Sequence, residues 1–197
     1  CASLTKMDIP ASVTQIGERS FNLCENLITV NFLGNDKITE IPERAFWGCY
    51  SLKNINLPES LETIGEDAFT GFTMRVFGTS TEKKGAALES IVIPKNVTKI
   101  DTYAFQYCDQ LKTVEIKGEL KQIGNYAFSD CVALNSINVS TVTKFGNSVF
   151  ANTAIEHLSI NGNATLGKNM FSGMTSLKTV TFTEGSTTLP SSMFSKC

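Results

Sequence analysis

The sequence predicts an α/β solenoid, a right-handed coil of about eight stacked repeats with short parallel strands and short helical or 3₁₀ turns. Three observations predict this fold. A nine-residue phrase such as IGNYAFSDC recurs along the chain, a second apolar pattern lies between its copies, and most copies follow one another after about 23 residues. A unit this short cannot bury its own apolar side, so neighbouring units have to stack.

A phenylalanine marks the recurring phrase. Successive copies lie 21 to 25 residues apart, except for the 36 residues between Phe69 and Phe105. An aliphatic or aromatic residue precedes each copy by five positions. We expect both positions to point inward, so that each ring lies over its counterpart one coil away. The phenylalanines are Phe21, Phe46, Phe69, Phe105, Phe128, Phe150, Phe171 and Phe194.

The pattern Leu-x-x-Ile-x-Ile, as in residues 134–139 (Leu-x-x-Ile-x-Val), alternates apolar and polar residues and predicts a short strand with one buried face. A turn follows, often at a proline such as Pro58. A second extended run then ends at a glycine such as Gly124. Finally, Ala-Phe-x-x-Cys carries bulky residues three positions apart, a spacing that suits one helical or 3₁₀ turn.

These motifs resemble the BspA-type leucine-rich repeat, and the resemblance extends from Leu4 to Cys197. It implies a curved leucine-rich repeat solenoid of surface-exposed proteins in host-associated bacteria and some protists, some of which act as adhesins for host proteins. It therefore implies a cell-surface or secreted location. The last three units depart from the pattern, because Thr153 and Met174 replace Cys and methionines precede Phe171 and Phe194.

The repeats predict one domain over residues 1–197 with an insertion at 73–87, which makes that repeat about 13 residues longer than the others. Cys1 and Cys197 each close a unit, so both ends cut within a repeat. Terminal repeats normally carry polar caps. We therefore expect flanking residues beyond the ends, or end-to-end contacts.

Five of the six cysteines follow a phenylalanine by three positions, and Cys1 fits the same position of a preceding unit. The six form no C-x-x-C pair, so their spacing does not indicate a metal site. Phe72, Thr153 and Met174 take the same position in other units. This position therefore selects modest apolar bulk, which a free buried thiol provides. Cys1 and Cys197, at the ends, are the first candidates for an exception.

Composition indicates no catalytic or cofactor chemistry. The net charge of −2 is scattered without basic runs, which does not favour nucleic acid as a partner, and no apolar stretch is long enough to span a membrane. The single histidine, His157, lies on an expected strand, and no motif supplies the orienting acid and the nucleophile that a catalytic triad needs. We therefore expect no enzyme, no cofactor and no bound metal.

The first candidate site is the exposed side of the expected strands, which we call the ladder. Its side chains are short, polar and of mixed sign, and they could bind an extended partner or be ordinary solvated strand residues. The ladder candidates are Asn31, Asn54, Asn56, Ser90, Thr113, Glu115, Ser136, Asn138, His157, Ser159, Thr179 and Thr181.

The second candidate site is the insertion, because long irregular loops in repeat arrays are often functional. It offers Met74, Phe77, Lys83 and Lys84. The alternative is a surface excursion whose apolar part folds back over the repeat.

We therefore expect a non-enzymatic protein that binds a host or microbial macromolecule, such as an extracellular matrix protein. One alternative is a structural spacer or stalk that projects another domain. A less favoured alternative is a hydrolase, which needs two carboxylates or a Ser/His pair converging on one face. The ladder offers only Asp8 and Glu115 for this, several coils apart.

Overall fold

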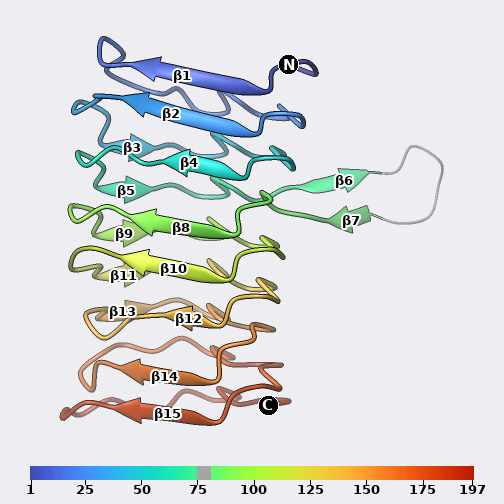
Figure 1. Cartoon of the computed structure of the whole chain (residues 1–197). Coiled ribbons are helices and arrows are strands. Elements are labelled where there is room, and N and C mark those ends of the chain that lie inside the picture. The colour runs from blue at the N-terminus through green and yellow to red at the C-terminus, as the bar shows by residue number, and fades with distance from the viewer. Residues whose placement is uncertain (75–80) are drawn as a thin grey trace.

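The computed structural model describes residues 1–74 and 81–197 and shows flat coils piled along one axis, with the two ends of the chain at opposite ends of the pile (Figure 1). Each coil has three sides: a longer strand, a shorter strand and a tight turn. A hairpin projects sideways from the pile between residues 72 and 83 (Figure 1). The predicted solenoid is confirmed.

The first side carries the Leu-x-x-Ile-x-Ile strands. They pair in parallel and in register, so that Val30 lies between Met7 and Ile55. The pairing forms three separate groups, β1-β2-β4, β8-β10-β12 and β14-β15. Their bounds are β1 Lys6–Pro10, β2 Thr29–Leu33, β4 Asn54–Asn56, β8 Ser90–Ile93, β10 Thr113–Ile116, β12 Ser136–Ile137, β14 His157–Ile160 and β15 Thr179–Phe182.

The second side is one parallel sheet of two-residue strands in the order β13-β11-β9-β5-β3. Glycine follows several of these strands because the coils approach closely there. A Cβ atom on Gly124 would lie 2.4 Å from the backbone nitrogen of Thr102. The strands are β3 Glu40–Ile41, β5 Thr63–Ile64, β9 Lys99–Ile100, β11 Gln122–Ile123 and β13 Lys144–Phe145.

The third side, which holds the phenylalanine phrase, consists of turns. Across residues 1–74 and 81–197 the chain forms no helix, so the short helical or 3₁₀ element is absent from the described part. The reason is the backbone two residues before and after the phenylalanine, where φ is positive, as at Tyr126 (55°) and Asp130 (61°). The N–H of Phe128 consequently donates across to the carbonyl of Val149 in the next coil, at 3.0 Å.

The eight phenylalanines form a continuous column through the core, as predicted. Their ring centroids lie 5.0 to 6.5 Å from one coil to the next. Neighbouring rings are nearly parallel, except that Phe194 tilts by 36° against Phe171. The six inner rings are fully buried, whereas Phe194 at the end of the pile is 45% exposed. The column therefore joins every coil to its neighbours through apolar contact.

Cysteines line the core beside this column. Cys24, Cys49, Cys108 and Cys131 are buried free thiols, and Cys1 and Cys197 are exposed free thiols. The thiol of Cys131 donates to the carbonyl of Phe105, one coil earlier, at 3.1 Å, and Cys49 repeats this contact with Phe21 at 3.1 Å. The position therefore selects a side chain that fills a small apolar space and also donates a weak hydrogen bond.

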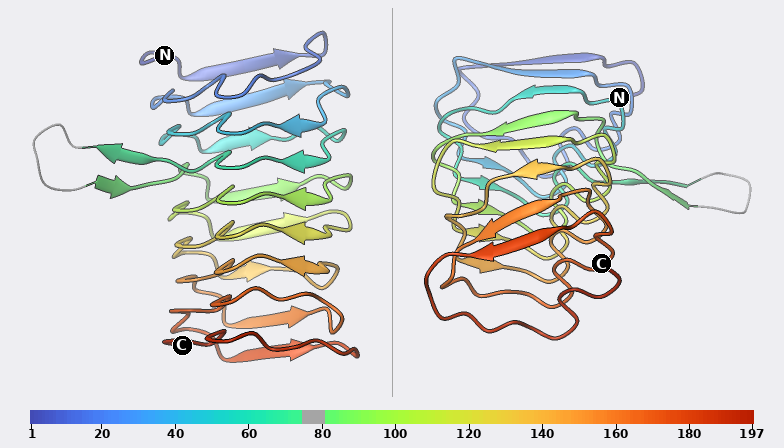
Figure 2. Two further views of the ribbon diagram at one scale, coloured as in Figure 1. Left: turned by 180° about the vertical axis from the view of Figure 1, so that it is seen from behind. Right: turned by 60° about the horizontal axis from the view of Figure 1, so that its bottom comes forward.

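The insertion is an antiparallel hairpin of β6 (Phe72–Met74) and β7 (Thr81–Lys83). Its strands lead away from the solenoid rather than back over it (Figure 2). The expectation that Phe72 takes the cysteine position was wrong. Ala86 takes it instead, because its N–H donates to the carbonyl of Phe69 at 2.9 Å and its side chain is buried. The hairpin is thus inserted into the repeat between Gly71 and Ala86.

Candidate functional site

The ladder side chains lie on the outer face of the first side, as the alternation predicted. All are exposed except Asn31, which is half-buried. Strand pairing does not run through the whole ladder. No strand pairing joins β4 to β8 among the described residues, and a single bridge between Val139 and Ile160 joins the neighbourhood of β12 to β14. The hairpin enters the chain between β4 and β8, where the pairing is interrupted.

Several ladder side chains bind one another. The amide of Asn31 donates to Asp8 at 2.7 Å, and the ammonium of Lys6 pairs with the same carboxylate at 2.9 Å. Nδ1 of His157 lies 2.8 Å from the hydroxyl of Thr179. Part of the hydrogen-bonding capacity of this face is therefore used within the protein, as expected of a solvated sheet surface.

The ladder does not bring catalytic groups together. Asp8 lies on β1 and Glu115 on β10, in separate sheets, and Glu115 pairs with Lys117. The described residues contain no group of three or more His, Cys, Asp or Glu side chains placed to hold a metal ion. A helix long and apolar enough to cross a membrane is also absent from the part of the chain that the structure describes.

The second candidate site is only partly described. Met74 and Lys83 lie on β6 and β7, and Phe77 lies outside the described residues. Lys84 is exposed at the base of the hairpin. Its ammonium nitrogen lies 6.0 Å from the centre of the Tyr50 ring, within reach of a cation–π contact.

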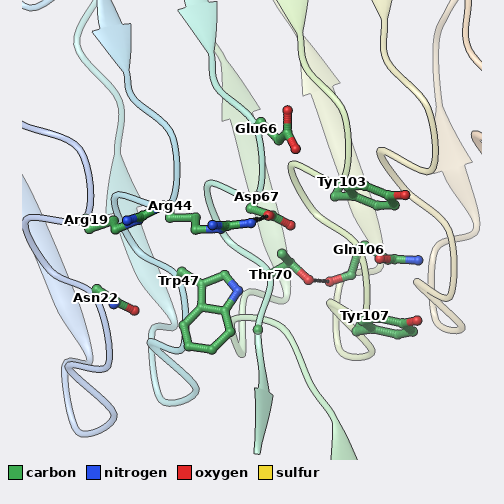
Figure 3. A pocket seen from close by; sticks show the side chains of 11 residues that line it. Arg19, Asn22, Arg44, Trp47, Glu66, Asp67, Thr70, Tyr103, Gln106 and Tyr107 are labelled. Atoms are coloured by element: carbon green, nitrogen blue, oxygen red, sulfur yellow. Dashed lines mark hydrogen bonds and ion pairs between the residues drawn. The ribbon is translucent and has the colours of Figure 1, made fainter.

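Sequence reasoning missed a groove on the third side of the solenoid, beside the base of the hairpin. We call it the aromatic groove, and its volume is about 570 Å³. Trp47 lies on one side of Thr70, and Tyr103 and Tyr107 lie on the other (Figure 3). Its lining is Arg19, Asn22, Arg44, Trp47, Glu66, Asp67, Thr70, Gly71, Tyr103, Gln106 and Tyr107.

The groove exists because one coil presents small residues between two coils that present large ones. One position after the phenylalanine, successive coils carry Trp47, Thr70 and Gln106. Thr70 is buried, and its hydroxyl donates to the carbonyl of Gln106 at 2.7 Å, which fixes the floor. Gly71 continues the floor, where a Cβ atom would lie 2.8 Å from the nitrogen of Gly48.

An ion-pair network forms one edge of the groove. The guanidinium of Arg44 donates through Nε and Nη2 to Oδ2 of Asp67, at 2.9 Å for each. Glu43 accepts from Arg44 at 3.3 Å and from Arg19 at 3.2 Å. The hydrogen bond to Asp67 raises the pKa of Arg44 above its ordinary value. These contacts hold both guanidinium groups in place at the surface.

Glu66 differs from these acids. Its side chain is exposed at the groove edge, and within the described residues its carboxylate has no hydrogen bond or ion pair. Partial burial raises its pKa, and the negative charges of Asp67, Glu43 and Asp101 raise it further. Its three acidic neighbours each pair with an Arg or Lys side chain, whereas Glu66 has no such pair among the described residues and suits a cationic group brought by a partner.

The sequence contains a signal for this groove. Large aromatic side chains occur within two residues of the buried phenylalanines at Trp47, Tyr103, Tyr107 and Tyr126. Tyr103 and Tyr126 hold equivalent places 23 residues apart, and their rings stack at 5.3 Å. The sequence prediction used only the inward-facing residues of the repeated motif and therefore missed these outward-facing aromatic side chains.

Comparison with solved structures supports the fold. A leucine-rich repeat protein from Bacteroides ovatus is 26% identical, with 92% of this chain and 55% of that chain covered and a TM-score of 0.57. The pneumococcal vaccine antigen PcpA is 24% identical, with 98% and 54% covered and a TM-score of 0.55. The leucine-rich repeat protein of T. pallidum is 18% identical, with 88% and 78% covered and a TM-score of 0.54.

The chain thus spans about half the length of the first two structures. No curated protein matches its sequence. The BspA type leucine rich repeat region matches in 6 copies over residues 1–75 and 77–197, which together make up nearly all of the chain. The protein therefore belongs to the BspA-type leucine-rich repeat family.

Proposed function

We propose that the chain is a non-enzymatic interaction module, carried on a cell surface or in a secreted protein, that binds a protein partner through the aromatic groove. The observation that carries this proposal is the set of large rings beside two held guanidinium groups. Trp, Tyr and Arg are the residues that most often dominate the energy of protein interfaces. The groove volume of about 570 Å³ lies within the range of ordinary ligand sites.

The groove is also held rigid. Its residues Trp47, Thr70 and Gln106 each directly follow a buried phenylalanine of the column, and backbone hydrogen bonds such as Gly48 N to Thr70 O, at 2.9 Å, join neighbouring coils at its floor. A preformed surface loses little conformational entropy when a partner binds. Rigidity therefore favours recognition by this face.

The ladder remains a proposal for a second contact surface. Its short polar side chains on paired strands suit an extended partner that makes many hydrogen bonds. Two properties make it the weaker candidate: part of its polar groups bind one another, and the strand pairing is interrupted between β4 and β8. The surface or secreted location rests on the family resemblance.

Binding to purified extracellular matrix proteins, measured by surface plasmon resonance, tests the proposal. Trp47→Ala should weaken binding by about tenfold or more, as truncation of an interface anchor does. Phe182→Ala is the control, because Phe182 is an exposed aromatic residue on β15, away from the groove. Equal binding by wild type and Trp47→Ala would exclude the groove as the contact surface. Failure to bind any of the proteins would favour the spacer alternative.

A further inference from the structure

The charge around the aromatic groove indicates what kind of partner fits it. A second hollow of about 600 Å³ adjoins the groove, and both are lined by Glu66. The carboxylates of this second hollow, which we call the acidic hollow, belong to Glu18, Glu40, Glu43, Glu66 and Asp101. Together the groove and the hollow are lined by six carboxylates and two guanidinium groups. Glu43, Asp67 and Asp101 pair with Arg or Lys side chains, so that among the described residues the unpaired carboxylates are those of Glu18, Glu40 and Glu66 and the combined surface has a net negative charge.

The repeat itself produces part of this charge. Glu18, Glu43 and Glu66 each stand three residues before the phenylalanine of their unit. Stacking therefore places them on consecutive coils, where like charges destabilise the fold. Arg19 and Arg44 both pair with Glu43, but among the described residues neither Glu18 nor Glu66 has an ion-pair partner. The carboxylate of Glu43, which is ion-paired, therefore lies between those of Glu18 and Glu66, which are not.

We infer that the aromatic groove and the acidic hollow together bind a basic, extended segment of a protein. A lysine or arginine side chain would lie between Trp47 and Tyr107, where its stem packs on the rings. Its charge would face Glu66, and further basic residues would follow the hollow toward Glu18. This inference rests on the proposed function and names the chemistry of the partner.

Three features of the molecule favour this occupant over an acidic or neutral one. Aromatic faces attract cations, and of the two carboxylates that line the groove Asp67 is paired with Arg44 whereas Glu66 has no ion pair among the described residues. Both guanidinium groups of the groove already bind carboxylates of the protein, which leaves them poorly placed to hold an acidic partner. Partial burial and, after it, the negative charges of neighbouring acids raise the pKa of Glu66, and a bound cation would offset that repulsion.

Fluorescence polarisation with labelled peptides tests the inference. The probes are three acetylated and amidated peptides of equal length, in which glycine alternates with lysine, serine or glutamate. The lysine probe should bind, more weakly at high salt because screening reduces the attraction, and the glutamate probe should not. Glu66→Gln should weaken binding of the lysine probe by about threefold, and Trp47→Ala by about tenfold.

Glu119→Gln is the matched control. It removes one carboxylate from an exposed side chain paired with Lys121, outside both hollows. Circular dichroism confirms that each variant is folded. Binding that responds to Glu66→Gln but not to Glu119→Gln supports the inference. An equal loss of lysine-probe binding in the two variants would show that net charge alone accounts for the effect, and it would overturn the inference.

The outcomes separate this inference from the proposed function. Binding of the serine probe as tightly as the lysine probe, with dependence on Trp47, would overturn the basic partner and leave a groove that binds neutral polypeptide. The basic partner would also be overturned if matrix proteins bind through Trp47 and the lysine probe does not bind. Binding of the lysine probe with no matrix protein bound would support the basic segment and exclude only the partners tested.

Discussion

The ring of Phe105 stacks on the ring of Phe69, with centroids 5.0 Å apart and planes 8° apart, although a hairpin separates them in the sequence. The next step of the column, from Phe105 to Phe128, is 5.3 Å. The insertion therefore leaves the core unbroken. The N–H of Lys84 donates to the carbonyl of Gly71 at 3.2 Å, which brings the two ends of the insertion together at the surface.

Removal of residues 72–84 should accordingly leave the solenoid folded. Joining Gly71 to Gly85 restores the spacing of six residues between phenylalanine and leucine that Phe105 and Leu111 show. An isolated two-stranded hairpin is marginal by itself, so we expect the free energy of unfolding to change by less than about 1 kcal/mol. Urea denaturation followed by circular dichroism measures it. Deletion of residues 124–136, which is equally long but removes Phe128, should abolish folding; if both deletions unfold the chain, the hairpin is part of the core.

Phe105→Ala should destabilise the protein by about 3 to 5 kcal/mol, because it leaves a cavity in the middle of the column. Phe194→Ala should cost much less, since Phe194 is 45% exposed at the end of the pile. The midpoint of urea denaturation compares the two. Similar losses at both positions would contradict a continuous column with an open end.

The core could be predicted from the sequence because its residues repeat at fixed offsets. Phe69 and Phe105 keep their places relative to neighbouring aliphatic residues even across the insertion. The turn could not be assigned in the same way. Two bulky residues three positions apart suit a helical turn as well as successive tight turns, and only the backbone shows that Tyr126 and Asp130 have positive φ. That conformation directs N–H groups to the next coil instead of along a helix.

The aromatic groove depends on relations between coils that one repeat does not show. Trp47 and Tyr107 come from units separated by the hairpin, and the space between them exists because Thr70 and Gly71 are small. Aligning the units by their outward residues would have brought these side chains to attention. The interruption of the ladder could not be foreseen, because the strand patterns on both sides of the hairpin are regular.

The buried thiols should be unreactive in the folded protein. Burial raises the pKa of Cys49 and Cys108 to about 12 and that of Cys131 well above its ordinary value, so almost none of their thiolate exists at pH 8. Alkylation with iodoacetamide should modify the exposed Cys197 first and these three residues only after unfolding in urea. Peptide mass spectrometry locates the label. Labelling of Cys108 at the rate of Cys197 without denaturant would show that the coils open readily.

Glu66→Gln should stabilise the fold at pH 7, and the gain should disappear in acid. The folded state raises the pKa of Glu66 above its ordinary value of 4.5, so folding disfavours the charged form that exists at pH 7. Because the side chain is exposed, the gain is at most about 0.5 kcal/mol. The gain in stability should be complete above the raised pKa and fall as the pH drops through that value to below 4.5, where Glu66 is protonated in both states and resembles glutamine.

Urea midpoints of wild type and Glu66→Gln between pH 7 and pH 4 measure the change. Glu119→Gln is the control: Lys121 lowers the pKa of Glu119, so this variant should lose stability at pH 7 instead. A gain from Glu66→Gln that persisted at pH 4 would show that packing accounts for it, rather than the cost of ionising a partly buried carboxylate beside other acids.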